Sequence, residues 1–522
     1  MNTASQRPRK LAPAQISRGS VIQRNTRRLR SSMLALMASC VAVAVSAEAT
    51  TRRVDLVIQN VTVIDPETQR VLPARSVYVD AGKIISVRPA ARSSGLIARR
   101  TISGKGRFLI PGLMDMHAHL FLPEAPKSSL NLLLANGVTS IREMSSDCWA
   151  AAGVTEGCIA SYRKLQSDIR AGRVVGPDLV ALTSPMIMGP TRLKLPEGTP
   201  SFVTPVTPGE GTLATQELTK RGVDLIKTHD SIPFPAFQAI MQEAKRTSQR
   251  VGGHIPFRAG SVGAAELGYA SIEHARDLLY DCSRFGAEFR RREADFAEGV
   301  AGSARPPNLE RLTRTVTEFD SNLCLKMLSR LARTGVYYVP THVTREMEAL
   351  AADPAYRADP SRKFIMPDRN ARWEDDLADT AKLPANERSA LAAFYRHGLR
   401  ITGLAHQAGV PIMAGTDLND TMITPGFSLH RELRLLHEAG LSNMAVLRAA
   451  TTVPAAYLAR SKDLGGISAG KQADLVLLRL NPLKDISNTR AIEAVINDGR
   501  VLSRAELDDL LNEVRQLVIS RR

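Results

Sequence analysis

Two histidines separated by one residue are the first feature of this sequence that could do chemistry. His117 and His119 lie in the apolar segment Met114–His119. Alternate residues of a β-strand point to the same side, so both imidazoles could reach one ion. Imidazole nitrogen is a common ligand of zinc, and the pair therefore indicates a metal site.

Four further candidate residues stand at the ends of short apolar segments that are typical of strands. They are Lys227, His254, His274 and Asp417. The chain has ten histidines, and four of them, including the pair at 117 and 119, occupy predicted strand ends. In an eight-stranded parallel barrel the carboxyl ends of the strands meet on one face, where active sites lie. The six residues therefore predict one polar site.

The middle of the chain supplies the strands that this site needs. Strand-like segments alternate with segments of helical pattern, such as Phe237–Thr247 and Gly398–Ala408, which predicts an α/β fold with a parallel sheet. Eight such units favour a closed (β/α)8 TIM barrel over residues 111–464. The strand-like segments are Leu113–His117, Val138–Glu143, Leu179–Ser184, Val223–Lys227, Arg250–His254, Ser271–His274, Val336–Thr341 and Pro411–Asp417.

Both ends of the chain are rich in short alternating segments that predict β-structure. Near the N-terminus these include Val54–Val61, Ser76–Val79 and Lys83–Val87, and residues 473–478 and 494–500 form a matching block. We expect one small sheet domain assembled from residues 54–110 and 465–505. Segment 187–213 is rich in Gly, Pro and Thr, whereas segments 283–320 and 345–390 are charged and are expected to carry helices. These insertions could form lids or substrate walls over the strand ends.

Several motifs of the chain together resemble the amidohydrolase superfamily, in particular its imidazolonepropionase-like and Xaa-Pro dipeptidase-like members. The resemblance covers roughly residues 54–500. It includes the lead-in Leu109–Asp115, the His-Ala-His pair, Ser271–His274, Ala414–Asp417, and the closing Ala449–Ala455 and Ala473–Val476. It implies a distorted (β/α)8 barrel with a composite β-sandwich.

The resemblance also implies a role for each candidate residue. His117, His119 and Asp417 would hold a buried metal ion, and His254 and His274 a more exposed one. Lys227, carboxylated by CO2, would bridge two zinc ions, because a carbamate is an anion with two oxygens. Asp417 would act as the catalytic proton carrier for a metal-activated hydroxide that cleaves a carbon–nitrogen bond.

Two departures from the family pattern affect the substrate. Phe257 stands three residues after His254, where the deaminases of the superfamily commonly have a glutamate, so a deaminase is disfavoured. His229 stands where dipeptidase-like relatives often have an aromatic residue. His229, Thr341 and His342 are weaker candidates for contact with a small-molecule or short-peptide substrate.

Three other functions remain compatible with the sequence. A hydrolase with one metal ion would leave Lys227 unmodified. A lactonase or other ester hydrolase could use the same centre, because activated water attacks either kind of carbonyl. A non-catalytic binding protein is disfavoured, because all six candidate positions are occupied. A homo-oligomer is compatible with each of these functions.

The basic charge is concentrated at the N-terminus, which predicts export rather than binding to nucleic acid. The net charge is +17, and residues 1–49 carry eight Lys or Arg and one acidic residue. Arg24–Arg30 precede the apolar run Met33–Val45, and small residues near Ala47 and Ala49 suit signal cleavage. We expect a periplasmic or secreted protein without a membrane span after cleavage. The alternative is a single-pass anchor.

Four cysteines would remain after cleavage of the signal segment. In an oxidising compartment Cys148 and Cys158 could close a short disulfide loop. The alternative is separate buried thiols, Cys282 and Cys324 among them. The sequence alone leaves both open.

Overall fold

The computed structural model describes residues 52–91, 95–120, 128–147, 158–189 and 204–521. The predicted signal segment (residues 1–49) and Cys148 lie outside the described residues. Within the described part of the chain, every helix is too short or too polar to cross a membrane.

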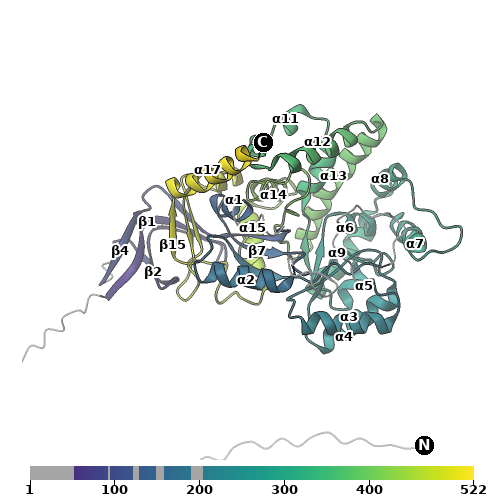
Figure 1. Cartoon of the computed structure of the whole chain (residues 1–522), viewed down its shortest axis with the longest axis horizontal. Coiled ribbons are helices and arrows are strands. Elements are labelled where there is room, and N and C mark those ends of the chain that lie inside the picture. Colours follow the sequence, from purple (N-terminus) through teal and green to yellow (C-terminus); the bar gives the residue numbers. More distant parts are fainter. Residues whose placement is uncertain (1–51, 92–94, 121–127, 148–157, 190–203, 522) are drawn as a thin grey trace, which may run out of the picture. The chain divides into compact units, whose positions relative to one another are not determined.

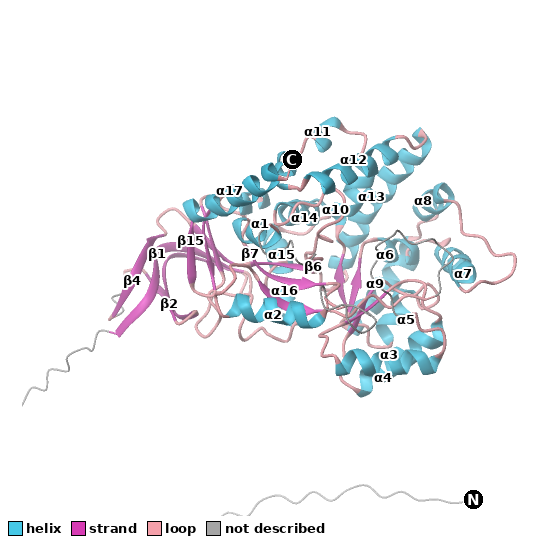
Figure 2. Ribbon diagram, viewed as in Figure 1, coloured by secondary structure: helices cyan, strands magenta, loops and turns pink. Residues whose placement is uncertain are grey.

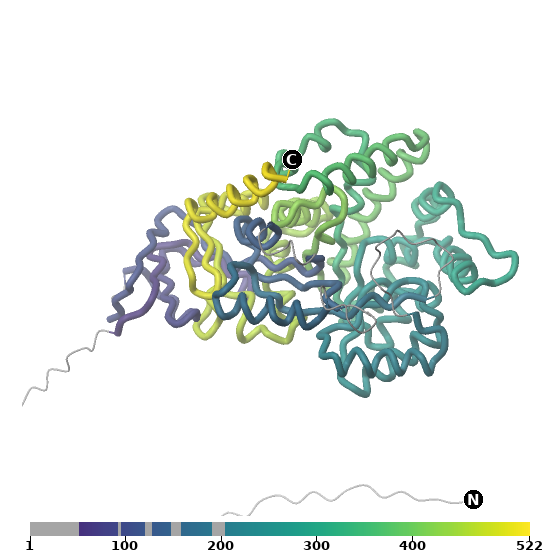
Figure 3. The backbone as a smooth tube through the Cα atoms, in the orientation of Figure 1, coloured from purple at the N-terminus to yellow at the C-terminus, as the bar shows by residue number. Residues whose placement is uncertain are grey.

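One eight-stranded sheet combines strands from both ends of the chain. Its order is β15-β14-β13-β5-β1-β2-β3, and β4 pairs with β1. β13 runs antiparallel to β5, so that purple and yellow segments lie side by side in Figure 3. The strands are β1 (Arg52–Asp65), β2 (Arg70–Asp80), β3 (Lys83–Pro89), β4 (Leu96–Ser103), β5 (Phe108–Pro111), β13 (Leu475–Leu478), β14 (Ile492–Asn497) and β15 (Arg500–Ser503).

Turn chemistry and a bent strand shape this sheet. Ala81 and Gly82 both have positive φ, at 47° and 74°, as a tight hairpin between β2 and β3 requires. β1 changes register twice between Ile58 and Val63, and it pairs with β4 before these bulges and with β5 after them. Bulges bend a strand, so the sheet folds over its own apolar core, which includes Ile58, Val61 and Val63.

The rest of the described chain is an α/β unit with two parallel sheets (Figure 2). The three-stranded sheet has the order β6-β7-β8, and the four-stranded sheet has the order β12-β11-β10-β9. Their strands are β6 (Leu113–Ala118), β7 (Val138–Glu143), β8 (Asp178–Leu182), β9 (Ile226–Thr228), β10 (Val251–Gly253), β11 (Ser271–Glu273) and β12 (Tyr337–Val339). All of their residues are buried except for parts of β8 and β12, as expected for parallel strands covered by helices.

Backbone hydrogen bonds join these two sheets at both edges. On one side, the amide of Ser184 donates to Leu225 O (2.9 Å) and that of Ile187 to Lys227 O (2.8 Å). On the other side, residues 411–418 pair with both β12 and β6: Met413 N donates to Tyr338 O, and Met116 N to Ala414 O, each at 2.9 Å.

The segment Pro411–Asp417 was predicted as the eighth strand, and the structure does not give it regular strand geometry. Pro411 has no amide hydrogen to donate to a ladder, and Asp417 has a φ of 61°. The segment makes isolated pairings at Ile412 and Leu418 instead. It nevertheless occupies the place between β12 and β6 that the prediction required.

Helices cover the parallel strands and extend beyond them, as Figure 1 shows. Segments 283–320 and 345–390 are largely helical, as the sequence predicted. The helices are α1 (Ser129–Ala135), α2 (Ile159–Arg170), α3 (Pro208–Lys220), α4 (Phe234–Arg246), α5 (Gly260–Glu266), α6 (Arg276–Asp281), α7 (Gly286–Ala297), α8 (Asn308–Thr317), α9 (Ser321–Thr334), α10 (His342–Leu350), α11 (Pro354–Arg357), α12 (Pro367–Ala381), α13 (Ala385–Gln407), α14 (Phe427–Glu438), α15 (Asn443–Ala449), α16 (Thr452–Tyr457) and α17 (Arg504–Ser520).

A disulfide joins the end of α6 to α9. It links Cys282 to Cys324, and both side chains are fully buried. The alternative of separate thiols is therefore wrong for this pair. Cys158 is also disulfide-bonded, while its predicted partner Cys148 lies outside the described residues.

Candidate active site

Three of the predicted metal ligands converge at the carboxyl end of β6. Nε2 of His117 and Nε2 of His119 each lie 3.3 Å from Oδ1 of Asp417. One ligand atom from each residue falls within 4.8 Å of the other two, a spacing that suits a single ion. His117 is fully buried, whereas His119 and Asp417 keep about a fifth of their side chains exposed. The group therefore has a closed side and an open side.

The hydrogen bonds of His117 leave one ring nitrogen available as a ligand. Nδ1 lies 2.8 Å from Oε2 of Glu273, a buried carboxylate that accepts a hydrogen bond from it. Nε2 is buried and makes no hydrogen bond of normal geometry with the described residues. A carboxylate behind the ring fixes the tautomer in which the other nitrogen can bind a metal. This unpaired Nε2 atom is therefore available to coordinate a divalent ion.

Glu273 is in turn held by a buried arginine that sequence reasoning missed. Arg142 on β7 donates to Oε1 of Glu273 (2.7 Å) and to the hydroxyl of Tyr457 (3.0 Å). Ser271 donates to the same carboxylate oxygen at 2.6 Å. Burial raises the pKa of Glu273, but the charge of Arg142 outweighs it and the pKa falls to about 2. Glu273 was visible in the segment Ser271–His274, yet nothing in the sequence paired it with Arg142.

The carboxyl of Asp417 is partly buried. Burial raises its pKa, but the charges of His117 and His274 outweigh this effect and hold the pKa well below its usual range. Oδ2 lies 3.6 Å from Nδ1 of His274. Both carboxylate oxygens therefore face imidazole nitrogens.

Lys227 lies at the carboxyl end of β9 and is almost completely buried, with 2% of its surface exposed. Its Nζ is 3.3 Å from Nε2 of His119. Burial is the main cause that lowers the pKa of its amine. The pKa of His119 falls to about 4, mainly because of burial and then because of the charge of Lys227. The lysine is therefore close enough to reach an ion held by His119.

His254 and His274 form a second pair beside the first group. Their Nε2 atoms are 2.9 Å apart, and Nδ1 of His274 lies 2.9 Å from Oγ1 of Thr341. The rings of His117 and His274 are 4.8 Å apart between centroids. The structure thus brings all six predicted residues together. Thr341 is fully buried, so it contacts His274 rather than a substrate.

A third group on the same side was only partly anticipated. His229 stacks on His254 with 4.2 Å between ring centroids, and its Nδ1 lies 2.6 Å from Oδ1 of Asp230. His229, Asp230 and His254 also offer ligand atoms within 4.8 Å of one another. Arg276 donates to Asp230 (2.7 Å) and to Nδ1 of His254 (2.7 Å). Asp230 and Arg276 each follow a candidate histidine by one or two residues, and that proximity was the available signal.

His342 does not face this site. It is fully buried, and its Nε2 lies 2.9 Å from the hydroxyl of Thr402 on α13. It therefore belongs to the packing of α10 against α13, and its predicted contact with substrate has no support in this geometry.

Unusual backbone conformations aim several of these side chains. His274, Thr341 and Asp417 have φ values of 68°, 47° and 61°, in a left-handed region that residues with a side chain rarely occupy. Such strain is often concentrated at functional sites. At Gly415 a Cβ would come within 2.9 Å of the backbone nitrogen of His117, so only glycine allows the segment to lie this close to β6.

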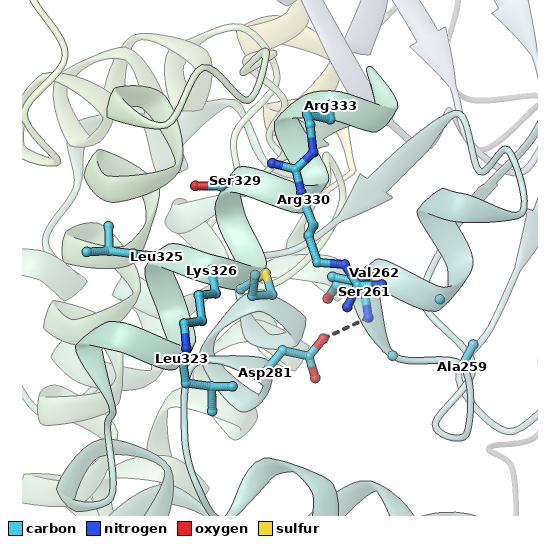
Figure 4. Close-up of a pocket in the computed structure, with 13 residues that line it drawn as sticks. Ala259, Ser261, Val262, Asp281, Leu323, Leu325, Lys326, Ser329, Arg330 and Arg333 are labelled. Atoms are coloured by element: carbon cyan, nitrogen blue, oxygen red, sulfur yellow. Dashed lines mark hydrogen bonds between the residues drawn. The ribbon is translucent and has the colours of Figure 1, made fainter. Parts of the chain in front are cut away.

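A separate hollow lies between α5 and α9 on the outside of the α/β unit (Figure 4). It has a volume of about 750 Å³, and Asp281 closes one side by accepting the amide of Ser261 at 2.7 Å. Leu323, Leu325 and Arg333 line another side. None of the predicted site residues contributes to it.

Comparison with known proteins places this chain in a family. The model of the amidohydrolase family matches residues 108–502. Two solved structures share the fold: a bottromycin amidohydrolase (20% identity, TM-score 0.63, 88% of this chain and 90% of that one) and a Xaa-Pro dipeptidase with bound methionine (20%, 0.58, 86% and 99%). Adenine deaminase 2 of Shouchella clausii is 34% identical over 89 residues, which span 17% of this chain and 15% of the deaminase. The chain belongs to the amidohydrolase family.

Proposed function

We propose that this chain is a metal-dependent hydrolase that cleaves a carbon–nitrogen bond in a small molecule or a short peptide. The observation that carries the proposal is the buried, unbonded Nε2 of His117, which faces Asp417 and His119 while Glu273 holds the opposite ring nitrogen. Asp417, His117 and His119 would hold the first ion. We further infer that segment 411–418 completes a distorted (β/α)8 barrel and that the sheet from both chain ends forms a composite β-sandwich.

The ion and the residues around it have separate roles in the proposed reaction. A divalent ion such as zinc, when bound, would supply the Lewis acidity that makes water a nucleophile near neutral pH. Asp417 is ionised and its carboxylate lies in the half-open side of the group, so it can accept a proton from the attacking water. It then delivers that proton to the leaving nitrogen as the carbon–nitrogen bond breaks. Glu273 and Thr341 keep His117 and His274 in fixed orientations.

Metal dependence and bond type can be tested together. Protein stripped of metal with a chelator is assayed against dipeptides, N-acyl amino acids, cyclic amides and lactones, with and without added zinc. We expect zinc to restore hydrolysis of at least one substrate with a carbon–nitrogen bond. Full turnover by the stripped protein would refute metal dependence. Hydrolysis confined to lactones would refute the bond assignment.

We propose that Lys227 carries a carbamate that reaches a second ion held by His254 and His274. The lowered pKa of its buried amine favours the neutral form, which attacks CO2, forms an N–C bond and releases one proton. The product is an anion in place of a neutral amine beside the candidate ligands. Protein equilibrated with 13C-bicarbonate and zinc should show a carbamate carbon signal by NMR. Its presence at equal intensity in Lys227→Gln would refute the assignment.

We also propose export, from the basic and apolar N-terminal segments. Removal of the signal segment would start the mature protein near Glu48 or Thr50. N-terminal sequencing of protein recovered outside the cytoplasm should give such a start. An intact N-terminus on cytoplasmic material would refute export.

A further inference from the structure

Arg276 places a fixed positive charge against His254, one of the two histidines proposed to hold the second ion. It is the first residue of α6, two positions after His274. One guanidinium nitrogen, Nη2, lies 2.7 Å from Oδ2 of Asp230 and 2.7 Å from Nδ1 of His254. A guanidinium only donates hydrogen bonds and stays charged at any ordinary pH. Nδ1 of His254 therefore acts as an acceptor toward it.

This contact fixes the protons along the whole histidine chain. With Nδ1 accepting, the proton of neutral His254 sits on Nε2 and points at Nε2 of His274, 2.9 Å away. His274 then carries its proton on Nδ1, toward Oγ1 of Thr341. Burial, together with the charges of His229 and Arg276, holds the pKa of His254 well below its usual value. Both ring nitrogens of His254 are thus engaged.

The same guanidinium also ties up the neighbouring group that could hold an ion. The ligand atoms of His229, Asp230 and His254 lie within 4.8 Å of one another. Arg276 takes Oδ2 of Asp230 and Nδ1 of His254, while Nδ1 of His229 lies against the other oxygen of Asp230. A cation in this place needs the same acceptor atoms that Arg276 already uses.

We propose that Arg276 is a tethered cation that fills the position among His229, Asp230 and His254, so that a second metal ion that uses Nδ1 of His254 binds only by displacing it. The inference rests on the proposed function, which assigns the first ion to His117, His119 and Asp417. A second ion must release Arg276 from His254 and also overcome the repulsion between like charges. Its affinity is consequently lower than that of the first ion.

A second carboxylate lies close to the side chain of Arg276. Its side chain is 26% exposed, and its Nε lies 4.0 Å from Oδ2 of Asp277. That oxygen is buried and has no hydrogen-bond partner among the described residues. Rotation of the side chain toward Asp277 would release Asp230 and His254, and the guanidinium would keep a carboxylate partner.

The test is a titration of the metal-free, full-length protein with zinc by calorimetry, with chelator competition for tight steps. Wild-type protein should show a first step and a second step at least about tenfold weaker. In Arg276→Met, which keeps an unbranched apolar side chain without charge or donors, the second step should tighten by about tenfold or more. The first step should stay within about twofold. Arg276→Ala is the second variant, should Arg276→Met fail to fold.

Arg258→Gln is the matched control, because Arg258 lies in the loop after β10 and pairs with Asp295 and Glu298 away from the site. It should leave both steps unchanged. A second step of equal strength in wild type and the Arg276 variants would overturn the inference and leave the first ion standing. Loss of the first step in wild type itself would overturn the proposed function as well.

Discussion

At the scale of single residues, the site depends on proton positions set by neighbours. Glu273 accepts a hydrogen bond from one ring nitrogen of His117, which leaves the other ring nitrogen free to bind an ion. Arg142 holds Glu273 ionised inside the protein. Residue type and spacing indicated the candidate ligands themselves. They did not reveal these supports, because Arg142 and Glu273 are 131 positions apart and meet only through folding.

Asp417→Asn should abolish most turnover while leaving the fold intact. An amide cannot accept the proton of attacking water as a carboxylate does, and lost proton transfer costs on the order of 10²- to 10⁴-fold in rate. The measurement is kcat with a substrate found in the zinc-restoration assay, with circular dichroism to check folding. Asp379→Asn is the control, since Asp379 is 80% exposed on α12. Turnover equal to wild type would remove Asp417 from the mechanism.

At the scale of elements, most strands of the α/β unit follow the apolar segments seen in the sequence. β7 matches its predicted segment Val138–Glu143 in full. Segment 411–418 does not, because Pro411, Gly415 and the left-handed Asp417 interrupt regular pairing. Local sequence predicts where a strand lies better than how it bends toward a site. Helices were expected within segments 283–320 and 345–390, but the sequence did not give their bounds.

Gly415→Ala should weaken both the fold and the metal site. The new Cβ would lie 2.6 Å from Cγ1 of Val339 and 2.9 Å from the backbone of His117, so residues 411–418 must shift away from β6. Overpacking of this kind costs about 1–3 kcal/mol. Urea unfolding and zinc affinity should both fall. Gly263→Ala, at an open position in α5, is the control and should not destabilise. Equal zinc affinity in Gly415→Ala and wild type would contradict this role.

Glu432 makes the contact between α14 and α10 sensitive to pH. Its carboxylate accepts the amide of Val343 at 3.0 Å, and burial raises its pKa to about 8. Between the ordinary value of 4.5 and about 8, the unfolded chain releases a proton that the folded chain keeps. Stability therefore falls as pH rises through this window, by up to about 1.4 kcal/mol per pH unit.

Glu432→Gln should remove this contribution. We expect the variant to gain stability relative to wild type as pH rises from 5 to 8, measured by urea unfolding of metal-free protein. Glu438→Gln, on the exposed part of the same helix, should run parallel to wild type. A constant difference between Glu432→Gln and wild type across this range would show that Glu432 does not titrate as described.

At the scale of the whole molecule, two long-range links join distant parts of the chain, and the sequence predicted only the first of them. Strands from both chain ends form one sheet, and the disulfide between Cys282 and Cys324 closes a separation of 42 residues. The pairing of cysteines depends on how α6 and α9 pack, which residue spacing does not reveal. The predicted signal segment agrees with a disulfide, because such bonds persist in oxidising compartments.

Replacing both Cys282 and Cys324 by alanine should lower the free energy of unfolding. A closed loop of this length restricts the unfolded chain, which corresponds to about 4 kcal/mol in the loop-entropy model. Urea unfolding under non-reducing conditions gives the difference. Stability within about 1 kcal/mol of wild type would mean that this disulfide does not constrain the unfolded chain.

The metal content of three proteins tests the central claim most directly. Wild type, His117→Gln and the control His437→Gln, whose histidine bonds Leu441 O at the end of α14, are loaded with zinc, dialysed and measured by elemental analysis. We predict about one or more zinc ions per chain in wild type and in the control, and loss of tightly bound zinc in His117→Gln. Zinc retained equally by His117→Gln, or absent from wild type, would contradict a metal centre built on His117, His119 and Asp417.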